Sequence, residues 1–364
     1  MKIAILVDNI YIPYGLSRAV LNLANILTAY GINVHIASRH SIAGASIPFC
    51  VTSEIKIHDL GGDELPKSFL QKCRLNVKLL QNFCKLIKKE KFDIIISTRC
   101  IQNCFTPFYV RIAKTIGCEH GNYMYVPRLR RFIRRLCYPR LDAVVLLTHH
   151  DAAHYNFIPE KKRFVIPNSL SFTCDTPSNC ENKRIIALRR LDPQKGFDYL
   201  LQAAVKLKRE IPDWHIDIFG NGDDEAMLKE LARKLQVDDF VTFHPPTKEV
   251  VKELCNSGMY VMSSRFEGLP MVLIEAQECG LPIVSFDCPE GPSEVIHEGE
   301  DGFLVPLADT DALAEKIIAL AKNQDMRKKF GQNAKINCQR FSPQNVGAMW
   351  QKLIDNLMND KDKL

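Results

Sequence analysis

The sequence has no long hydrophobic run. In a chain of 364 residues, no apolar stretch approaches the roughly 20 residues that a membrane-spanning helix needs. The first residues, MKIAILVDNIYIP, hold one lysine and a short apolar run that stops at Asp8. A secretory signal has a longer apolar core followed by a small-residue cleavage site. We therefore expect this segment to form a first β-strand, and we expect the protein to be cytoplasmic.

Paired cysteines are also missing. The chain has 13 cysteines, an odd number, and no two of them form a CxxC pair. We interpret most of them as free thiols in a reducing compartment. His150 and His154 lie four residues apart on an expected helix, a spacing that suits zinc. The HExxH pattern is absent and no distant third ligand stands out, so we favour a helix start capped by Thr148 over a metal site.

The composition is that of a globular protein. Apolar residues make up 46% of the chain and charged residues 25%, which excludes a disordered chain. The length exceeds the size at which a single hydrophobic core usually stops growing, so we expect two domains.

Short apolar segments alternate with longer amphipathic ones. The expected strands are residues 3–7, 33–37, 92–97, 143–147, 184–188, 215–219, 240–243, 260–263 and 283–286. Helices are expected between them, an order typical of parallel sheets that are covered on both faces. The pattern pauses from Pro167 to Lys183, a stretch with Asn, Ser, Thr and Pro that we interpret as a domain linker.

These patterns predict an α/β protein with two Rossmann-like domains, each a doubly wound parallel sheet, facing an interdomain cleft that binds the ligand. We expect the first domain to span residues 1–170 and the second to span residues 171–340. Residues 341–364 are expected to add a C-terminal amphipathic helix, which Ser342 caps and Pro343 begins.

Two glutamates flank a turn that leads into an expected helix. Glu267 precedes Gly268-Leu269-Pro270, and Glu275 follows eight residues after Glu267. With Pro270 at the first helical position, the amide groups of residues 269–272 are free to bind an anion such as phosphate. Glu275 is placed to accept hydrogen bonds from a ribose, and Glu267 from a sugar hydroxyl. The alternative is that both are solvated acids, but the turn and helix together favour a binding site.

A second candidate element is ALRRLDPQKGFDYLLQAA, residues 187–204. Arg189 and Arg190 close a strand, and Lys195 stands just before Gly196. A strand-end arginine and a loop lysine five residues apart, Arg190 and Lys195, can both reach one diphosphate. Gly196 at the junction of loop and helix frees backbone amides for the same ligand. An ordinary basic surface turn is the less favoured alternative.

Two further candidates lie in the first half of the chain. Gly15 follows the first strand and allows close approach of a phosphate, and Ser17 is a candidate helix cap. His120, after an expected short strand, is suited to hydrogen bonding or proton transfer, although a lone histidine is more often structural. The run FGNGDD lacks the third glycine of a dinucleotide fingerprint, which excludes a nicotinamide site there.

Acidic residues are absent from 121–141. This stretch holds six arginines: Arg128, Arg130, Arg131, Arg134, Arg135 and Arg140. Leu129, Phe132, Ile133 and Leu136 interleave with them at helical spacing, which predicts a basic amphipathic helix. An anionic membrane surface and a solvated face over a core stripe both fit this pattern. Aromatic residues for base stacking are few, so a nucleic-acid partner is not expected.

Together these segments resemble the retaining glycosyltransferases of family four with the GT-B fold, among them those of bacterial surface-polysaccharide synthesis. RFEGLPMVLIEAQECGLPIVS resembles the family's Glu-x7-Glu segment, and RRLDPQKGFDYLLQA resembles its diphosphate loop. The resemblance implies that Glu267 faces the donor sugar, that Glu275 holds the ribose, and that Arg190 and Lys195 neutralise the diphosphate. The residues implied at the nucleotide-sugar site are Gly15, Arg190, Lys195, Glu267, Gly268, Leu269, Pro270, Met271 and Glu275. Those implied in catalysis are Glu267, His120, Arg190 and Lys195.

The implied reaction is transfer of a hexose, with retention, from a nucleotide-diphosphate donor with uridine as the favoured base. The implied acceptor is a lipid-linked or saccharide molecule in lipopolysaccharide or capsule synthesis, at the inner face of the cell membrane. The membrane contact of residues 128–135 is not part of the resemblance and stays one of the two interpretations of that basic stretch. Neither a metal nor another cofactor is implied, because the two cations replace the metal. A nucleotide-sugar epimerase of the same fold, or a non-catalytic binder of nucleotide sugars or anionic lipids, stays open as an alternative.

Overall fold

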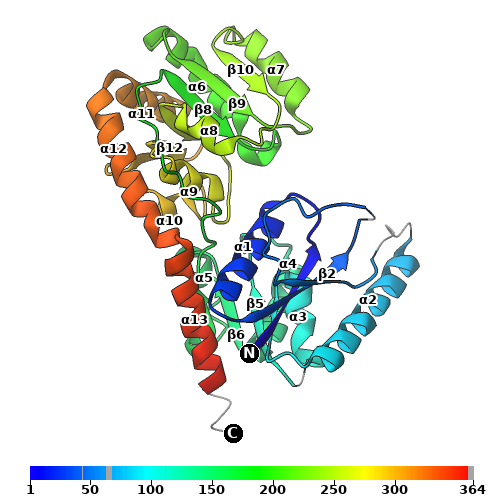
Figure 1. Ribbon diagram of the computed structural model, residues 1–364. Coiled ribbons are helices and arrows are strands. Elements are labelled where there is room, and N and C mark those ends of the chain that lie inside the picture. Colours follow the sequence, from blue (N-terminus) through cyan, green and yellow to red (C-terminus); the bar gives the residue numbers. More distant parts are fainter. Residues whose placement is uncertain (43, 63–67, 111, 360–364) are drawn as a thin grey trace. The chain divides into compact units, whose positions relative to one another are not determined.

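The computed structural model describes residues 1–42, 44–62, 68–110 and 112–359 (Figure 1). The chain divides into two compact units. Unit 1 comprises Met1–Ser171 together with the segment from Ser342 onward, and unit 2 comprises Phe172–Phe341. The boundaries expected after residues 170 and 340 each differ from this division by one residue.

Unit 1 is built on a parallel sheet with the strand order β3-β2-β1-β4-β5-β6-β7 across the described residues. Ile3 of β1 pairs with Val34 of β2 on one side and with Ile94 of β4 on the other. The order reverses direction between β1 and β4, so the sheet is doubly wound, as expected. Its strands are β1 (Lys2–Asn9), β2 (Asn33–His40), β3 (Lys56–Asp59), β4 (Ile94–Ser97), β5 (Lys114–Cys118), β6 (Ala143–Leu146) and β7 (Arg163–Val165).

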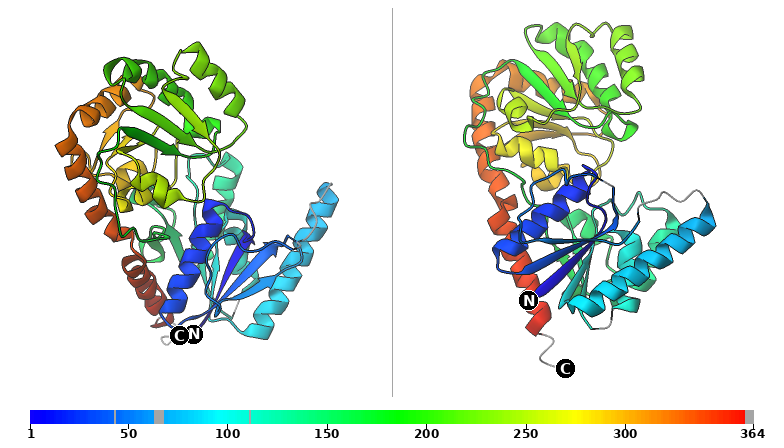
Figure 2. Two further views of the ribbon diagram at one scale, coloured as in Figure 1. Left: turned by 45° about the horizontal axis from the view of Figure 1, so that its top comes forward. Right: turned by 45° about the vertical axis from the view of Figure 1, so that its right-hand side comes forward.

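Helices cover both faces of this sheet. They are α1 (Gly15–Ala29), α2 (Phe69–Glu90), α3 (Cys100–Tyr109), α4 (Arg128–Cys137), α5 (His149–Ala153) and α13 (Pro343–Asn359), with short 3-10 turns η1 (Tyr138–Arg140) and η2 (Glu160–Lys162). Successive residues of a strand point to opposite faces. Ile3 and Ile5 therefore pack in the core formed with α1 and α13, whereas Ala4 and Leu6 pack in the core formed with α2. The right-hand view of Figure 2 shows α1 and α13 on one side of the sheet and α2 on the other.

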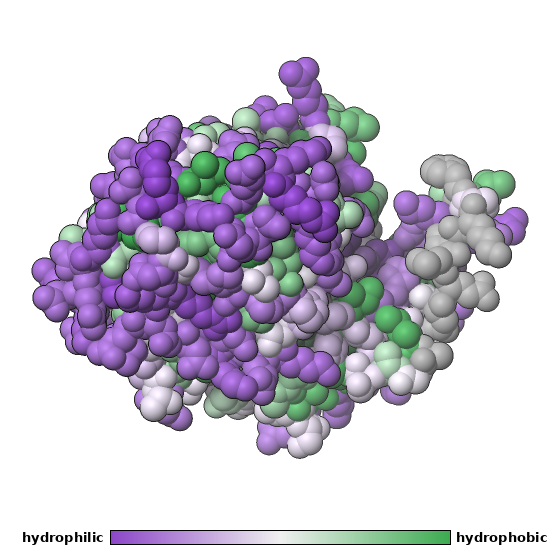
Figure 3. All heavy atoms as spheres, turned by 90° about the horizontal axis from the view of Figure 1, so that it is seen from above, coloured by the Kyte–Doolittle hydropathy of each residue, from purple (hydrophilic) through white to green (hydrophobic). Residues whose placement is uncertain are grey.

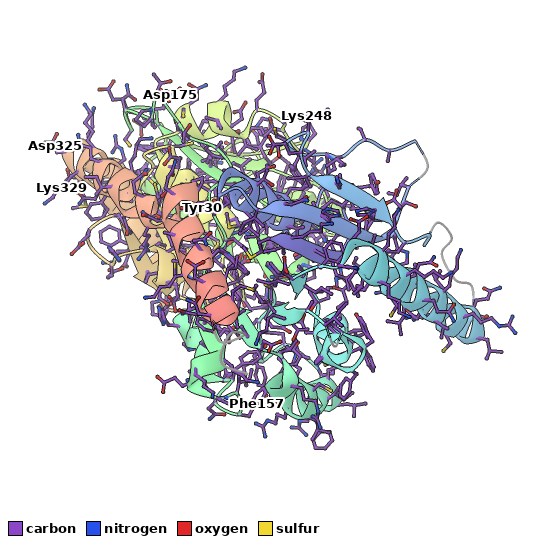
Figure 4. All side chains as sticks on the ribbon, turned by 60° about the horizontal axis from the view of Figure 1, so that its bottom comes forward. Tyr30, Phe157, Asp175, Lys248, Asp325 and Lys329 are labelled. Atoms are coloured by element: carbon purple, nitrogen blue, oxygen red, sulfur yellow. The ribbon has the colours of Figure 1, made fainter. Side chains whose placement is uncertain are left out.

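The C-terminal helix α13 is an integral part of unit 1. The Ser342 hydroxyl accepts a hydrogen bond from the Asn345 amide at 3.3 Å, the cap that the sequence predicts. Tyr30, labelled in Figure 4, donates its hydroxyl proton to the Gln344 carbonyl at 3.2 Å. A Cβ at Gly347 would lie 2.6 Å from the Tyr30 ring, so glycine there lets α13 approach α1 closely.

We expect Trp350→Ala to lower the free energy of unfolding of unit 1 by about 3–5 kcal/mol, because it opens a large cavity under α13. Trp350 is 4% exposed in the unit 1 core, whereas its neighbour Met349 is 39% exposed. Met349→Ala is therefore the matched control, with little expected change. Urea denaturation followed by circular dichroism measures both; equal losses in the two variants would show that α13 does not anchor through Trp350.

Unit 2 repeats the architecture, with the strand order β10-β9-β8-β11-β12-β13. The direction of the order reverses between β8 and β11, which is the switch point of this second doubly wound sheet. Its strands are β8 (Arg184–Leu188), β9 (His215–Phe219), β10 (Val241–His244), β11 (Met259–Met262), β12 (Ile283–Phe286) and β13 (Gly302–Val305). Its helical elements are η3 (Pro193–Lys195), α6 (Phe197–Glu210), α7 (Glu225–Lys234), α8 (Val250–Cys255), α9 (Met271–Glu278), α10 (Pro292–Val295), α11 (Thr310–Lys322), α12 (Gln324–Asn337) and η4 (Cys338–Phe341).

No helix in the described part of the chain is both long enough and apolar enough to cross a membrane. On the face that Figure 3 shows, most side chains are hydrophilic and the hydrophobic areas between them are small.

Candidate functional site

The candidate site of unit 2 lies at the carboxyl ends of two neighbouring strands. β8 pairs with β11 through Ile185 and Met259, and the loops that follow these strands carry the basic residues and Glu267. Ligands of doubly wound sheets bind at this place, where the strand order reverses. The two sequence segments singled out above are therefore brought together by the fold.

Glu267 is held between two cations. The Lys195 ammonium lies 3.1 and 3.2 Å from the two oxygens of Glu267, and the Arg189 guanidinium lies 3.4 Å from Oε1. Glu267 is 5% exposed, and the side chains of Arg189 and Lys195 are 14% and 12% exposed. We call these three residues the cation–carboxylate cluster.

Backbone contacts hold the two loops of the cluster together. Gly196 has a φ of +62°, and a Cβ there would lie 2.1 Å from the Ser263 carbonyl oxygen, so this position requires glycine. The Ser263 hydroxyl donates to the Lys195 carbonyl at 3.2 Å, and the Gln194 amide donates to the Phe266 carbonyl at 2.9 Å. These contacts place Lys195 against the segment that carries Glu267.

A second close approach fixes the turn after Glu267. Gly291 has a φ of +125°, and a Cβ there would lie 2.0 Å from the Gly268 carbonyl oxygen. Pro270 is the N-cap of α9, not its first helical residue as expected, and α9 begins at Met271. The difference is one residue, and the first amides of α9 still lack partners within the helix.

Opposite charges keep the cluster ionised despite its burial. Burial alone would raise the pKa of Glu267, but Arg189 and Lys195 hold it below the ordinary value. Burial and the neighbouring Arg189 lower the pKa of Lys195, and Glu267 offsets part of that effect. Burial would lower the pKa of Arg189, but Glu267, Tyr260 and, to a smaller extent, Glu275 raise it. Glu275, 3% exposed on α9, therefore belongs to the same electrostatic site.

The structure does not bring Arg190 into the cluster. Its side chain is 66% exposed and lies 3.4 Å from Asp192, whereas Arg189 takes the buried place beside Glu267. The sequence places both arginines at the end of the strand, but the prediction assigned the site to Arg190 and not to Arg189. Side chains of adjacent residues at the end of a strand point in opposite directions. Only one of the two arginines can therefore turn inward, and the sequence does not indicate which of them does.

Two expected residues lie in unit 1. Gly15 begins α1, and a Cβ there would meet nothing within 4 Å, so no close contact in unit 1 requires glycine. Ser17 does not cap α1, contrary to expectation, because Tyr14 is the N-cap and the Ser17 hydroxyl donates to the Asn9 carbonyl at 3.0 Å. The cap of α1 therefore lies three residues earlier in the chain than the sequence indicates.

His120 follows β5 and is largely enclosed. It lines a small cavity of unit 1 with Thr98, Asn168 and Trp350 among the other lining residues. Its Nδ1 atom is buried and has no hydrogen-bond partner among the described residues. Burial lowers the pKa of His120 to about 4, so at neutral pH the ring is uncharged and one nitrogen donates while the other accepts.

One arginine of the basic stretch is structural. Arg134 is buried on α4, where its guanidinium lies 2.8 Å from the Glu119 carboxylate and 2.9 Å from the Tyr155 hydroxyl. The helix predicted from this stretch is present as α4, but one of its arginines, Arg134, is buried within unit 1. Its partner Glu119 lies just before the acid-free residues 121–141, so the composition of that stretch did not indicate an ion pair.

Three of the thiols lie together in unit 2, and the two histidines four residues apart both make ring contacts. All 13 cysteines are free. The sulfur atoms of Cys174, Cys255 and Cys279 lie within 4.8 Å of one another, and burial raises the pKa of Cys255 to about 11. His154 stacks on Tyr123 with ring centroids 5.5 Å apart, and Thr148 caps α5 as expected, accepting from the Asp151 amide at 3.0 Å.

Comparisons with known proteins cover nearly the whole chain. Residues 175–337 match the family described as glycosyl transferases group 1, and residues 13–172 match glycosyltransferase family 4. The amylovoran biosynthesis glycosyltransferase AmsD of Erwinia amylovora is 26% identical, over 97% of this chain and 99% of that protein. An α-1,4-N-acetyl-D-galactosaminyltransferase of Campylobacter jejuni, named for an acceptor on PP-undecaprenol, is 28% identical over 95% of this chain and 96% of its own.

Solved structures agree on the fold. The crystal structure of the pneumococcal O-GlcNAc transferase GtfA, in complex with UDP and GlcNAc, matches with a TM-score of 0.80. The match covers 98% of this chain and 99% of that chain at 14% identity. At this identity the likeness concerns the arrangement of the elements.

Proposed function

We propose that this protein is a retaining, metal-independent hexosyltransferase that takes its sugar from a UDP donor. The chain belongs to the GT-B glycosyltransferases, with a family 4 domain followed by a group 1 domain. The chain is a glycosyltransferase of polysaccharide or glycoconjugate synthesis. The observation that carries the finer proposal is the cation–carboxylate cluster at the switch point of unit 2, where Lys195 and Arg189 converge on Glu267.

Positive charge beside the departing diphosphate is the chemical contribution of unit 2. As the bond between sugar and phosphate breaks, negative charge builds up on the leaving oxygen, and a fixed cation stabilises it. Lys195 is pre-positioned for this role by its loop and by Glu267. Arg190 is exposed, and among the described residues its one ion pair is with Asp192. An exposed pair of this kind is worth little, so the guanidinium is available to a phosphate. These two cations do the work that a metal does in other transferases.

The carboxylates and the histidine orient the reactants. Glu267 faces the donor sugar, and Glu275 on α9 accepts hydrogen bonds from the ribose. The backbone from Gly268 to Met271 supplies amide donors at the start of α9. The acceptor hydroxyl loses its proton to the leaving phosphate, while the protein supplies position and excludes water. His120 is uncharged at neutral pH and orients a hydroxyl through a hydrogen bond.

The product configuration and the metal requirement test this proposal. Incubation with UDP-sugars and a lipid-linked saccharide, followed by NMR of the new linkage, should show the anomeric configuration of the donor. The rate should be unchanged by a chelator. An inverted product, dependence on a divalent ion, or isomerisation of the donor without any acceptor would each contradict it.

Arg189 and Arg190 should affect different kinetic constants. We expect Arg189→Met to lower kcat, because Glu267 loses one of its two partners and its position. We expect Arg190→Ala to raise the KM for the donor about 10-fold or more, since a hydrogen-bonded charge contact is worth about 1.5–3 kcal/mol, with the unfolding transition unchanged. Steady-state kinetics of both variants measure the split, and equal effects on KM would contradict it.

A further inference from the structure

Helix α4 exposes the apolar stripe that a surface helix normally buries. Leu129, Phe132 and Leu136 are 70%, 58% and 53% exposed, although they recur at the spacing of one helix face. In a globular domain such a stripe packs against the core. Here the buried contact of α4 is made by Arg134, which reaches Glu119, and the apolar stripe is left in solvent.

Helix α3 adds a second exposed stripe beside the first. Ile101, Phe105 and Phe108 are 55%, 58% and 51% exposed and recur every three or four residues. The two helices are in contact, as Figure 1 shows. Arg134 of α4 donates to the Cys100 sulfur at 3.1 Å. We call these six apolar residues, with the arginines around them, the α3–α4 surface.

Five arginines near this surface form no ion pair within the part of the chain that the structure describes, in contrast to the buried Arg134. Among the residues that the structure describes, none of Arg128, Arg130, Arg131, Arg135 and Arg140 forms an ion pair with a carboxylate. Aromatic rings hold several of them beside the apolar side chains instead. The Arg140 guanidinium lies 5.4 Å from the centre of the Phe108 ring, and that of Arg135 lies 5.8 Å from the centre of Phe157, labelled at the edge of unit 1 in Figure 4.

The combination of exposed apolar residues and uncompensated charge selects the kind of partner. A contiguous apolar patch that is exposed on a protein surface is typical of an interaction site. A second copy of the same surface would bring unpaired arginines against unpaired arginines, which is unfavourable. An anionic bilayer takes the apolar side chains into its acyl boundary and neutralises the arginines with its headgroups.

We propose that the α3–α4 surface docks unit 1 on an anionic lipid bilayer. This deepens the proposed function, on which the purpose of docking rests, because a lipid-linked acceptor lies in such a bilayer. The buried pair of Arg134 and Glu119 ties the docking helix to the end of β5, where His120 follows directly in the chain. Docking therefore presents the acceptor-side histidine at a fixed place relative to the membrane surface.

Vesicle sedimentation of the whole protein tests the proposal without donor or acceptor. Wild type should sediment with phosphatidylcholine vesicles that contain phosphatidylglycerol, and not with pure phosphatidylcholine vesicles at the same salt concentration. Arg130→Glu with Arg135→Glu should weaken this binding by about 10-fold or more, because each arginine near an anionic surface is worth about a factor of five. Phe132→Ser with Leu136→Ser should weaken it to a similar extent.

Matched variants in unit 2 provide the controls. Lys248→Glu with Lys329→Glu changes the net charge by the same amount at exposed positions that Figure 4 labels. Ile336→Ser removes an apolar side chain that is 73% exposed. Neither should change vesicle binding, and thermal unfolding should confirm that every variant is folded.

Three results would overturn the proposal. They are equal binding of wild type and the α3–α4 variants, equal binding to both kinds of vesicle, and a shift from oligomer to monomer in sedimentation velocity when Phe132 and Leu136 are replaced. The last result would identify the surface as a subunit interface. Since sedimentation needs no turnover, failure of docking and failure of the proposed transferase activity are separate observations.

Discussion

Lys195→Ala should lower kcat/KM for glycosyl transfer by about 100- to 1,000-fold, the usual loss when one preorganised group that stabilises developing charge is removed. The Lys195 ammonium contacts Glu267, and the Ser263 hydroxyl donates to the Lys195 carbonyl, so both the side chain and the backbone of this residue are held in place. Steady-state kinetics with a UDP-sugar donor measure the effect.

Lys329→Ala is the matched control for this variant. Lys329 is exposed on α12, away from the cation–carboxylate cluster in the chain, so its removal should leave kcat/KM within about twofold of wild type. A Lys195→Ala enzyme with nearly full activity would show that the diphosphate is bound elsewhere.

Glu267→Gln should cost both activity and stability. The substitution keeps the shape of the side chain but leaves Arg189 and Lys195 buried without a counter-charge, which typically costs about 3–5 kcal/mol of unfolding free energy. The loss of transfer activity should again be about 100-fold or more. Asp223→Asn, at an exposed position of unit 2, is the control and should change neither quantity.

The pH dependence separates this explanation from a general loss of packing. The pKa of Glu267 is lower in the folded protein than its ordinary value, so its stabilising contribution is complete above the ordinary pKa of glutamate and is lost as pH falls through the lowered one. Urea titrations across the acid range should show this loss in wild type and not in Glu267→Gln. Parallel pH curves would contradict the ion-pair account.

The sequence predicted the fold well because its central strands are buried on both faces. Segments such as 94–97 (IIIS) and 283–286 (IVSF) are mostly apolar and buried throughout, and parallel strands of covered sheets have this composition. The strands that it missed are short, such as β3 (KIHD) and β7 (RFV), and their residues are only partly buried. Edge strands bury one side at most, so they lack an apolar run. Helix α3 was missed because Pro107 interrupts its sequence pattern.

The candidate site was predictable as a set of segments but not as a set of contacts. The spacing of Glu267 and Glu275 and the Lys-Gly pair at 195–196 located both loops of the site. Side chains alternate between the two faces at the end of the strand, so a shift of one residue would exchange the places of Arg189 and Arg190. The sequence does not define the end of the strand to within one residue. The pairing of Arg134 with Glu119 depends on packing between α4 and β5, two elements whose contact no local pattern encodes.

Calorimetric titration with UDP and with uridine tests the central claim most directly, namely that the basic residues of unit 2 bind the diphosphate. Wild type should bind UDP much more tightly than uridine, with a chelator present throughout. In Lys195→Ala the two affinities should become similar, because the gain that the diphosphate provides is lost. If Lys195→Ala kept the full preference for UDP, the diphosphate would be bound by other groups and the account of the cation–carboxylate cluster would be wrong.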